Sequence, residues 1–216
     1  MPMKKIWVAV IILSVILAGF GGAALYFFWN DLFFSSGGRY ADDTLDYMNV
    51  IYENRADNYA FNEGYSESDA CPWGFEHNGL DFFLLNDSKV IAAAPGLVQE
   101  IQWRDYGEGV DNRFHISIAI RFNRDIIIRY NFEPWTEFAS DKDKQLAMYK
   151  VQEGDWVELG QEIARFLYVE EGAHIHFDVN VNYNQVCPQQ YYSTEGYNEM
   201  MEMIHSFQPT WNMCYS

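Results

Sequence analysis

Most of the chain after Cys71 consists of short runs in which apolar and polar residues alternate, with turn residues between the runs. Alternation over roughly four to eight residues predicts a half-buried strand. Strands are therefore predicted at Asp81–Leu85, Val90–Ala94, Gly96–Trp103, His115–Phe122, Asp125–Phe132, Lys150–Val157, Gln161–Tyr168 and Ala173–Val181. The predicted fold class is mainly β, an antiparallel β-sandwich or open barrel.

Two other stretches place their apolar residues at helical spacing. Leu45, Met48 and Ile51 recur at every third residue, which predicts one amphipathic helix within Tyr40–Tyr59. The stretch Glu195–Phe207 predicts a short C-terminal helix.

An uncharged apolar run covers residues 6–29, and about 20 such residues suffice to cross a bilayer as a helix. Lys4 and Lys5 precede this run and Asp31 follows it, so the positive-inside rule places the N-terminus in the cytoplasm. A cleaved signal peptide, cut near Gly22–Ala24, is the competing reading. The apolar run continues past that site, which favours an uncleaved transmembrane anchor.

These features predict a single-pass protein of the cell membrane whose C-terminal domain is extracytoplasmic. In chain order, we predict a cytoplasmic end, a transmembrane anchor, a juxtamembrane segment, a β domain and a helical tail, at residues 1–5, 6–29, 30–70, 71–192 and 193–216.

Composition and charge narrow the possible partners. Aromatic residues make up 18% of the chain, which favours strands over helices. The formal net charge of −17 repels phosphate backbones and anionic lipid headgroups at long range. We therefore expect no nucleic-acid partner, and contact with the membrane only through the N-terminal helix.

Three cysteines, Cys71, Cys187 and Cys214, lie in the part predicted to leave the cytoplasm. Disulfides persist there, so one bridge and one remaining thiol are expected. Three pairings are open, and closeness in sequence favours Cys187 with Cys214. The absence of a CxxC pair in the sequence argues against a zinc site made of these cysteines.

Two histidine clusters carry the candidate chemistry. On a strand, His174 and His176 share one face at a spacing of ~7 Å. His77 and Asp81 flank Gly79, which allows a turn into a strand. Each cluster alone is compatible with solvated surface residues. Together they supply two imidazoles and one carboxylate, the protein ligands of a catalytic zinc site with one position open to water.

The motifs around these clusters resemble those of the lysostaphin/LytM-type zinc endopeptidases. The resemblance runs in order through residues 73–192. It comprises His77-x-Gly-x-Asp81, the segment 90–98 with its Ala-Ala-Ala-x-Gly, the Gly- and Val-punctuated segment 151–163, His174-x-His176-Phe177, and Val186-Cys-Pro-x-x-Tyr191. It implies the LytM-type peptidase core as the fold.

The resemblance also implies roles for individual residues. His77, Asp81 and His176 would bind Zn²⁺, and His174 would be a catalytic histidine beside the metal-bound water. The implied activity is hydrolysis of peptides, with peptidoglycan-like cross-links rich in glycine or D-amino acids as the substrate class.

One position departs from the family pattern. A second catalytic histidine is expected in a Tyr-x-His-Leu stretch, and this chain has Phe132 in its place, after Tyr130. His115 and His205 are interpreted as surface or structural residues. Three readings stay open: a slow peptidase, one that uses Tyr130 or Glu133 instead, and an inactive LytM-like binding or activator module. The sequence favours the peptidase. A biotinyl or lipoyl carrier is excluded, because no lysine lies in a suitable hairpin.

Overall fold

The computed structural model describes residues 28, 32–35 and 37–216. These residues fall into two units, Met1–Ala41 and Asp42–Ser216. The predicted transmembrane anchor lies, apart from Phe28, outside the described residues. Among the residues that are described, no helix combines the length and apolar character that crossing a membrane requires.

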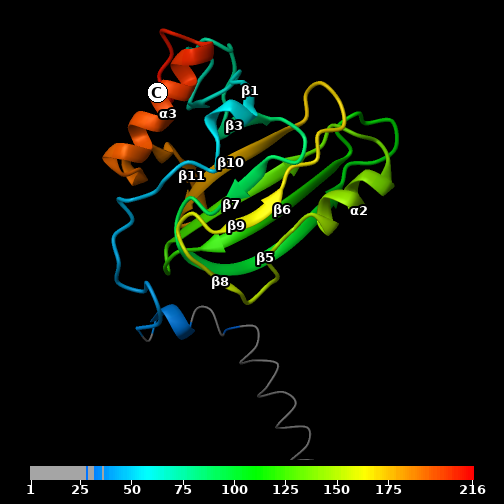
Figure 1. The fold of residues 1–216 in the computed structure, drawn as a ribbon. Coiled ribbons are helices and arrows are strands. Elements are labelled where there is room, and N and C mark those ends of the chain that lie inside the picture. Colours follow the sequence, from blue (N-terminus) through cyan, green and yellow to red (C-terminus); the bar gives the residue numbers. More distant parts are fainter. Residues whose placement is uncertain (1–27, 29–31, 36) are drawn as a thin grey trace, which may run out of the picture. The chain divides into compact units, whose positions relative to one another are not determined.

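The second unit is built on one large sheet (Figure 1), in which every strand pairing is antiparallel. The sheet confirms the mainly β, antiparallel class. Its strands follow the order β1 (Asn58–Ala60), β3 (Leu80–Leu84), β10 (His174–Val181), β7 (Ile126–Glu133), β6 (Phe114–Arg121), β5 (Gly96–Asp105) and β8 (Trp156–Val157), with β11 (Asn184–Val186) paired to β10.

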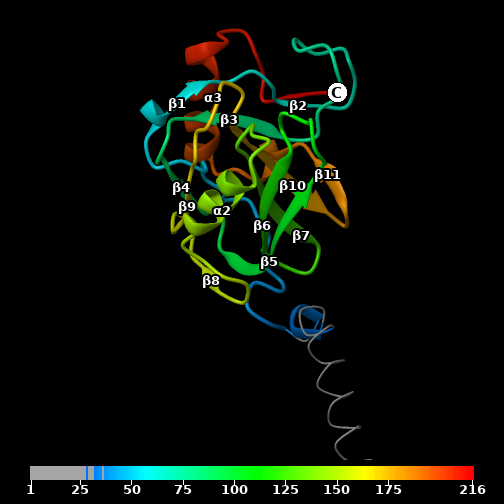
Figure 2. The ribbon, with the colours of Figure 1, turned by 90° about the vertical axis from the view of Figure 1, so that its right-hand side faces the viewer.

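Two small sheets and several helical elements complete this unit. Strand β4 (Lys89–Ile91) pairs with β9 (Glu162–Arg165). Strand β12 (Cys214–Tyr215), at the C-terminal end, pairs in parallel with β2 (Tyr65–Ser66), and Figure 2 shows the two side by side. The helical elements are η1 (Arg55–Asp57), α2 (Ala139–Ala147), η2 (Pro188–Tyr191) and α3 (Thr194–Phe207).

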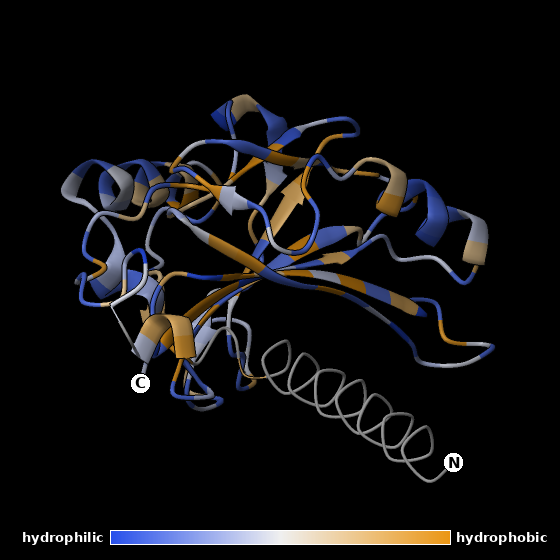
Figure 3. Cartoon of the chain, turned by 90° about the horizontal axis from the view of Figure 1, so that it is seen from below, coloured by the Kyte–Doolittle hydropathy of each residue, from blue (hydrophilic) through white to orange (hydrophobic). Residues whose placement is uncertain are grey.

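Apolar and polar residues alternate along the central strands, as the hydropathy colours of Figure 3 show. Since successive side chains of a strand point to opposite faces, one face of the sheet is apolar and the other polar. On β7, Tyr130 and Phe132 are fully buried, and Phe177 of β10 lies on the same face. The Ala93 amide donates to the Tyr130 hydroxyl oxygen at 2.6 Å, and Tyr149 packs on Phe132. This face is the core, and the opposite face is available for chemistry.

The predicted amphipathic helix within Tyr40–Tyr59 is wrong. Residues 40–59 are all described and contain turns, isolated bridges and the short η1, but no α-helix. Met48 and Tyr52 bridge to Tyr192 and Val90, so the main-chain groups of this segment bond to other elements. Its apolar residues are buried by tertiary contacts rather than by a helical stripe, and the segment from Asp42 onward belongs to the same unit as the sheet.

The other predicted elements are present, with bounds that are shifted, shorter or longer by one to several residues. Only Trp156–Val157 of Lys150–Val157 is a strand, because the turn at Gly154 (φ +92°) precedes it. The predicted C-terminal helix is confirmed as α3, whose first turn is capped by Ser193 Oγ accepting from the Gly196 amide at 2.9 Å. The Cys187–Cys214 disulfide is also confirmed, and Cys71 is the free thiol.

Candidate metal centre

The register of the sheet brings the predicted site residues together. His176 on β10 lies directly opposite Asp81 on β3. Directly opposed residues of antiparallel strands have Cβ atoms about 4.5–5.5 Å apart, so their side chains meet on a shared face. The His176 imidazole Nδ1 lies 2.9 Å from Asp81 Oδ1.

His77 reaches the same point from the loop that precedes β3. Its main chain bridges to Ser66 through reciprocal amide–carbonyl bonds of 3.1 and 2.7 Å. Its Nδ1 lies 2.7 Å from the Gly64 carbonyl oxygen, which can only accept a hydrogen bond. The proton of the neutral ring is therefore on Nδ1, and the lone pair of Nε2 is directed at Asp81 and His176.

The three donor atoms are spaced as zinc ligands require. His77 Nε2 lies 3.1 Å from His176 Nδ1 and 3.4 Å from Asp81 Oδ1, which is itself 2.9 Å from His176 Nδ1. Atoms bound at about 2.0–2.1 Å in tetrahedral geometry stand ~3.3 Å apart. Two imidazoles and one carboxylate at this spacing fit a zinc ion. We call His77, Asp81 and His176 the donor cluster.

Gly79 permits this close approach. A Cβ atom built there would lie 2.6 Å from both Cε1 and Nε2 of His176 and 2.6 Å from the Phe177 carbonyl oxygen. Any larger residue would press against the imidazole ring. The glycine of the His-x-Gly-x-Asp pattern is thus explained by space rather than by an unusual backbone angle.

The two histidines of the donor cluster hold protons more tightly than free imidazoles do when no metal is bound. Burial opposes the charge of the His176 imidazolium, but its hydrogen bond to the Asp81 carboxylate and the charge of that group raise the His176 pKa to about 9. Burial also opposes the charge of His77, and Asp81 still raises its pKa. In turn, His174 and His176 hold the Asp81 pKa well below its usual range against the effect of burial. A proton on His176 therefore competes directly with a metal ion.

Nearby, burial and the charge of Asp81 raise the pKa of Glu63 to about 7. Glu63 Oε2 lies 3.9 Å from His77 Nε2, at the margin of the donor cluster.

His174 lies on the same face of β10 as His176, two residues earlier in the strand. Its Nδ1 is 2.7 Å from the Gly172 carbonyl oxygen, so that nitrogen carries a proton, and Nε2 lies 3.7 Å from Asp81 Oδ2. The rings of Phe83 and Trp135 flank it, with centroids at 5.2 and 5.9 Å. Trp135 adopts a left-handed φ of +55°, an uncommon conformation for a bulky residue, to place its ring there.

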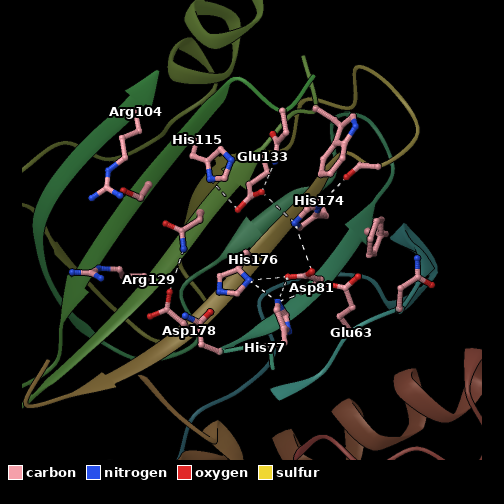
Figure 4. A pocket seen from close by; sticks show the side chains of 18 of the residues that line it. Glu63, His77, Asp81, Arg104, His115, Arg129, Glu133, His174, His176 and Asp178 are labelled. Carbon is pink, nitrogen blue, oxygen red and sulfur yellow. Dashed lines mark hydrogen bonds and ion pairs between the residues drawn. The ribbon is translucent and has the colours of Figure 1, made fainter. Parts of the chain in front are cut away.

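The donor cluster opens into a cleft of about 1080 Å³ that runs over the polar face of the central strands (Figure 4). All four predicted site residues line it. Two further residues face the same cleft: His115 of β6, which the sequence interpretation treated as a surface or structural residue, and Glu133 of β7, which it considered only as a possible substitute for the second histidine. The alternation of apolar and polar residues along both strands indicates which side chains face the cleft. Across the hairpin they form, His115 and Glu133 lie one position beyond the Ile116–Phe132 pair and share the cleft face.

The structure also corrects the place given to Phe132. This residue points to the core face, where it is fully buried against Tyr149, and it does not line the cleft. Its neighbours Asn131 and Glu133 face the cleft instead. A histidine at position 132 would therefore not reach the donor cluster. His205, by contrast, is exposed on α3 and bonds to the Trp211 carbonyl, as a surface residue would.

Several solved peptidase structures are similar to this chain. A zinc-containing peptidase from Vibrio cholerae is 21% identical with a TM-score of 0.43, and the match covers 65% of this chain and 38% of that one. The catalytic domain of lysostaphin from Staphylococcus simulans is 25% identical with a TM-score of 0.40, covering 60% of this chain and 89% of that domain. A mutant catalytic domain of the prophage-encoded protein EnpA from Enterococcus faecalis is 19% identical with a TM-score of 0.43, covering 61% and 90%.

Lysostaphin and LytM-type peptidases are thus among the structures this chain resembles, the family that its motifs also resemble. The chain spans 38% of the length of the Vibrio peptidase. No protein-family model matches the chain, and no curated protein does.

Proposed function

We propose that this protein is a zinc-dependent endopeptidase acting on peptides of the cell-wall type. The donor cluster carries the proposal. Two imidazole nitrogens and a carboxylate oxygen converge at 2.9–3.4 Å, the spacing of zinc ligands, and they open to a cleft large enough for a peptide. Bound zinc supplies a Lewis acid that polarises a peptide carbonyl and acidifies a water molecule.

The chain's own residues divide the remaining work. His77 and His176 offer lone pairs, and Asp81 adds the negative charge that favours a divalent cation. The Gly64 carbonyl fixes the His77 ring, as outer partners of zinc-binding histidines usually do. His174 is held through Nδ1, which leaves Nε2 at the edge of the donor cluster to take a proton from the attacking water.

The test is reversible dependence on zinc. The full-length protein is stripped with a chelator, reloaded with zinc and incubated with a glycine-rich peptide and with peptidoglycan fragments. We expect about one bound zinc, cleavage that disappears with chelation and returns with zinc, and loss of both in His176→Ala. His205→Ala, an exposed histidine outside the cleft, is the matched control. Cleavage that persists without metal would falsify the proposal.

An inactive binding module is the second candidate, and the departure at Phe132 from the family pattern favours it. The same experiment separates the two. Zinc bound at one equivalent, with intact substrate after long incubation, would support the binding module. Absence of zinc from a folded protein would exclude both.

We further propose that the N-terminal run anchors the protein in the cell membrane and that the domain lies outside the cytoplasm. The disulfide between Cys187 and Cys214 supports an oxidising compartment. Protease added to intact cells should degrade the region from residue 42 onward and spare a cytoplasmic marker. Full protection of this region, with digestion only after lysis, would contradict the topology.

A further inference from the structure

Beyond the donor cluster, the cleft contains a second group of titratable residues that the proposed function leaves unused. The Glu133 carboxylate lies between two histidines. Its Oε1 is 3.3 Å from His115 Nδ1, and its Oε2 is 3.5 Å from His174 Nε2. The Asn112 side-chain amide donates to Oε2 at 2.6 Å and fixes the carboxylate.

The sheet register explains this arrangement. Glu133 of β7 lies directly opposite His174 of β10, and His115 of β6 flanks it on the other side. Three adjacent strands thus place histidine, glutamate and histidine in one row across the cleft face. The donor cluster belongs to the neighbouring row, through His176 and Asp81. The two rows lie side by side on the cleft floor, and residues of both line the same cleft.

His115 is placed to exchange protons with a ligand in the cleft. Its side chain is 28% exposed, against 12% for Glu133, so the ring reaches solvent while the carboxylate beneath it is mostly buried. Tyr106 packs on the ring with centroids 4.5 Å apart and limits its orientation. The titratable or charged groups around it are Arg104 and Tyr106 on the side of β5, Glu133 on β7, and His174 and His176 on β10.

We propose that His115 is a second catalytic histidine of this cleft, oriented by Glu133 as its positioning residue. The inference rests on the proposed peptidase function and supplies the acid–base group that the family pattern places elsewhere. Phe132 stands at the expected sequence position but faces the core, whereas His115 reaches the cleft from the adjacent strand.

The proton balance of hydrolysis assigns a role to each histidine. The water oxygen bonds to the carbonyl carbon and its proton passes to His174. As the carbon–nitrogen bond breaks, the leaving nitrogen takes a proton from the imidazolium of His115. One proton is gained and one is lost, so peptide and water give two products without another reactant. His115 is reprotonated from solvent and His174 releases to solvent the proton it took from water. The Glu133 carboxylate favours the charged form of His115.

Replacing His115 tests the catalytic part. His115→Ala should lower kcat/KM by ~10²–10⁴, the usual contribution of a positioned acid or base. Zinc should still bind at one equivalent, because His115 is not in the donor cluster. Added imidazole should restore part of the rate in His115→Ala, a rescue that a structural role would not give. His205→Ala is again the control.

Replacing Glu133 tests the positioning part. In the unmodified protein, burial lowers the pKa of His115, and the charge of Glu133 offsets only part of this. Glu133→Gln removes that charge, so the His115 pKa should fall further and the alkaline limb of the rate profile should move to lower pH. NMR titration of the His115 ring measures the pKa shift whether or not the protein is turning over.

Four outcomes overturn the inference. Unchanged kcat/KM in His115→Ala, in a protein that cleaves peptides with zinc, would defeat this inference alone. A reduced rate without imidazole rescue, or a His115 titration unaffected by Glu133→Gln, would reduce the pair to a structural contact. An unmodified, zinc-loaded protein that cleaves no peptide would defeat the proposed function and this inference together.

Discussion

Strands β7 and β10 each have one apolar face, buried in the core, and one polar face, which lines the cleft. The residues of the two faces alternate along each strand. On one face Tyr130, Phe132 and Phe177 are fully buried and contact one another or other rings. On the other face Glu133 and His176 are linked through polar contacts to residues of three neighbouring elements. Since side chains alternate, a shift of one residue moves a group from the core to the cleft. Whether a side chain can reach the donor cluster therefore depends on the strand face it occupies as well as on the motif it belongs to.

The largest expected effect comes from removing the one carboxylate of the donor cluster. Asp81→Asn keeps the shape but removes the charge that draws a cation to the two imidazoles. Zinc affinity should fall by more than the ~10–100-fold that loss of an outer partner costs. Asp178→Asn is the control, because Asp178 is buried on the same face and bonds to Asn131 instead. Zinc titration of both variants measures the two affinities. An equal loss of zinc affinity in Asp81→Asn and Asp178→Asn would contradict the assigned ligands.

A histidine introduced on the core face should damage stability without adding activity. In Phe132→His a polar ring enters a fully buried apolar site, and an unpaired buried polar group costs ~1–3 kcal/mol. Phe132→Leu keeps the site apolar and should cost less. Urea unfolding gives the free energies, and peptide cleavage gives the rate. A Phe132→His variant of normal stability that cleaves peptide faster would show that position 132 reaches the cleft.

Zinc binding should release a proton near neutral pH. In the metal-free protein the His176 pKa is raised to about 9, so this ring is protonated at pH 7 and must lose its proton to bind zinc. Apparent affinity should therefore rise by up to about tenfold per pH unit, and the gain should end once pH exceeds about 9. Calorimetry in buffers of different ionisation enthalpy measures the release. Constant affinity between neutral pH and one unit above it would contradict the assignment.

The smallest expected effect concerns the space beside the donor cluster. Gly79→Ala adds a methyl group 2.6 Å from the His176 ring, so the ring or the strand must shift. Overpacking of this kind typically costs ~1–3 kcal/mol, of which we expect part to appear as roughly tenfold weaker zinc binding. Asn78→Ala, one residue earlier, should leave zinc binding unchanged. Unaltered affinity in both variants would mean that the ring has room to move.

The sequence was sufficient for features that depend on local pattern. Strand alternation predicted that His174 and His176 share a face, and motif resemblance associated them with His77 and Asp81. It could not assign Phe132 to a face, because a motif fixes the order of residues and not the register between strands. His115 was interpreted as a surface or structural residue for the same reason, since its contact with Glu133 exists only once β6 pairs with β7.

Burial by tertiary contacts also explains why the helix predicted within Tyr40–Tyr59 does not form. Leu45, Met48 and Ile51 have helical spacing, but an extended chain buries all three by contacting several elements. Within this segment, spacing alone did not reveal which surfaces would cover the apolar side chains.

The pairing of β12 with β2 has a consequence for biosynthesis. The Tyr65 amide donates to the Met213 carbonyl, and Gly64, the preceding residue, holds the ring of His77. Strand β12 therefore supports the segment that orients His77 of the donor cluster, and the disulfide from Cys214 to Cys187 fixes that strand. During synthesis, His77 is translated well over a hundred residues before Cys214 and Tyr215 of β12. Metal loading should consequently follow, rather than guide, closure of the C-terminal end.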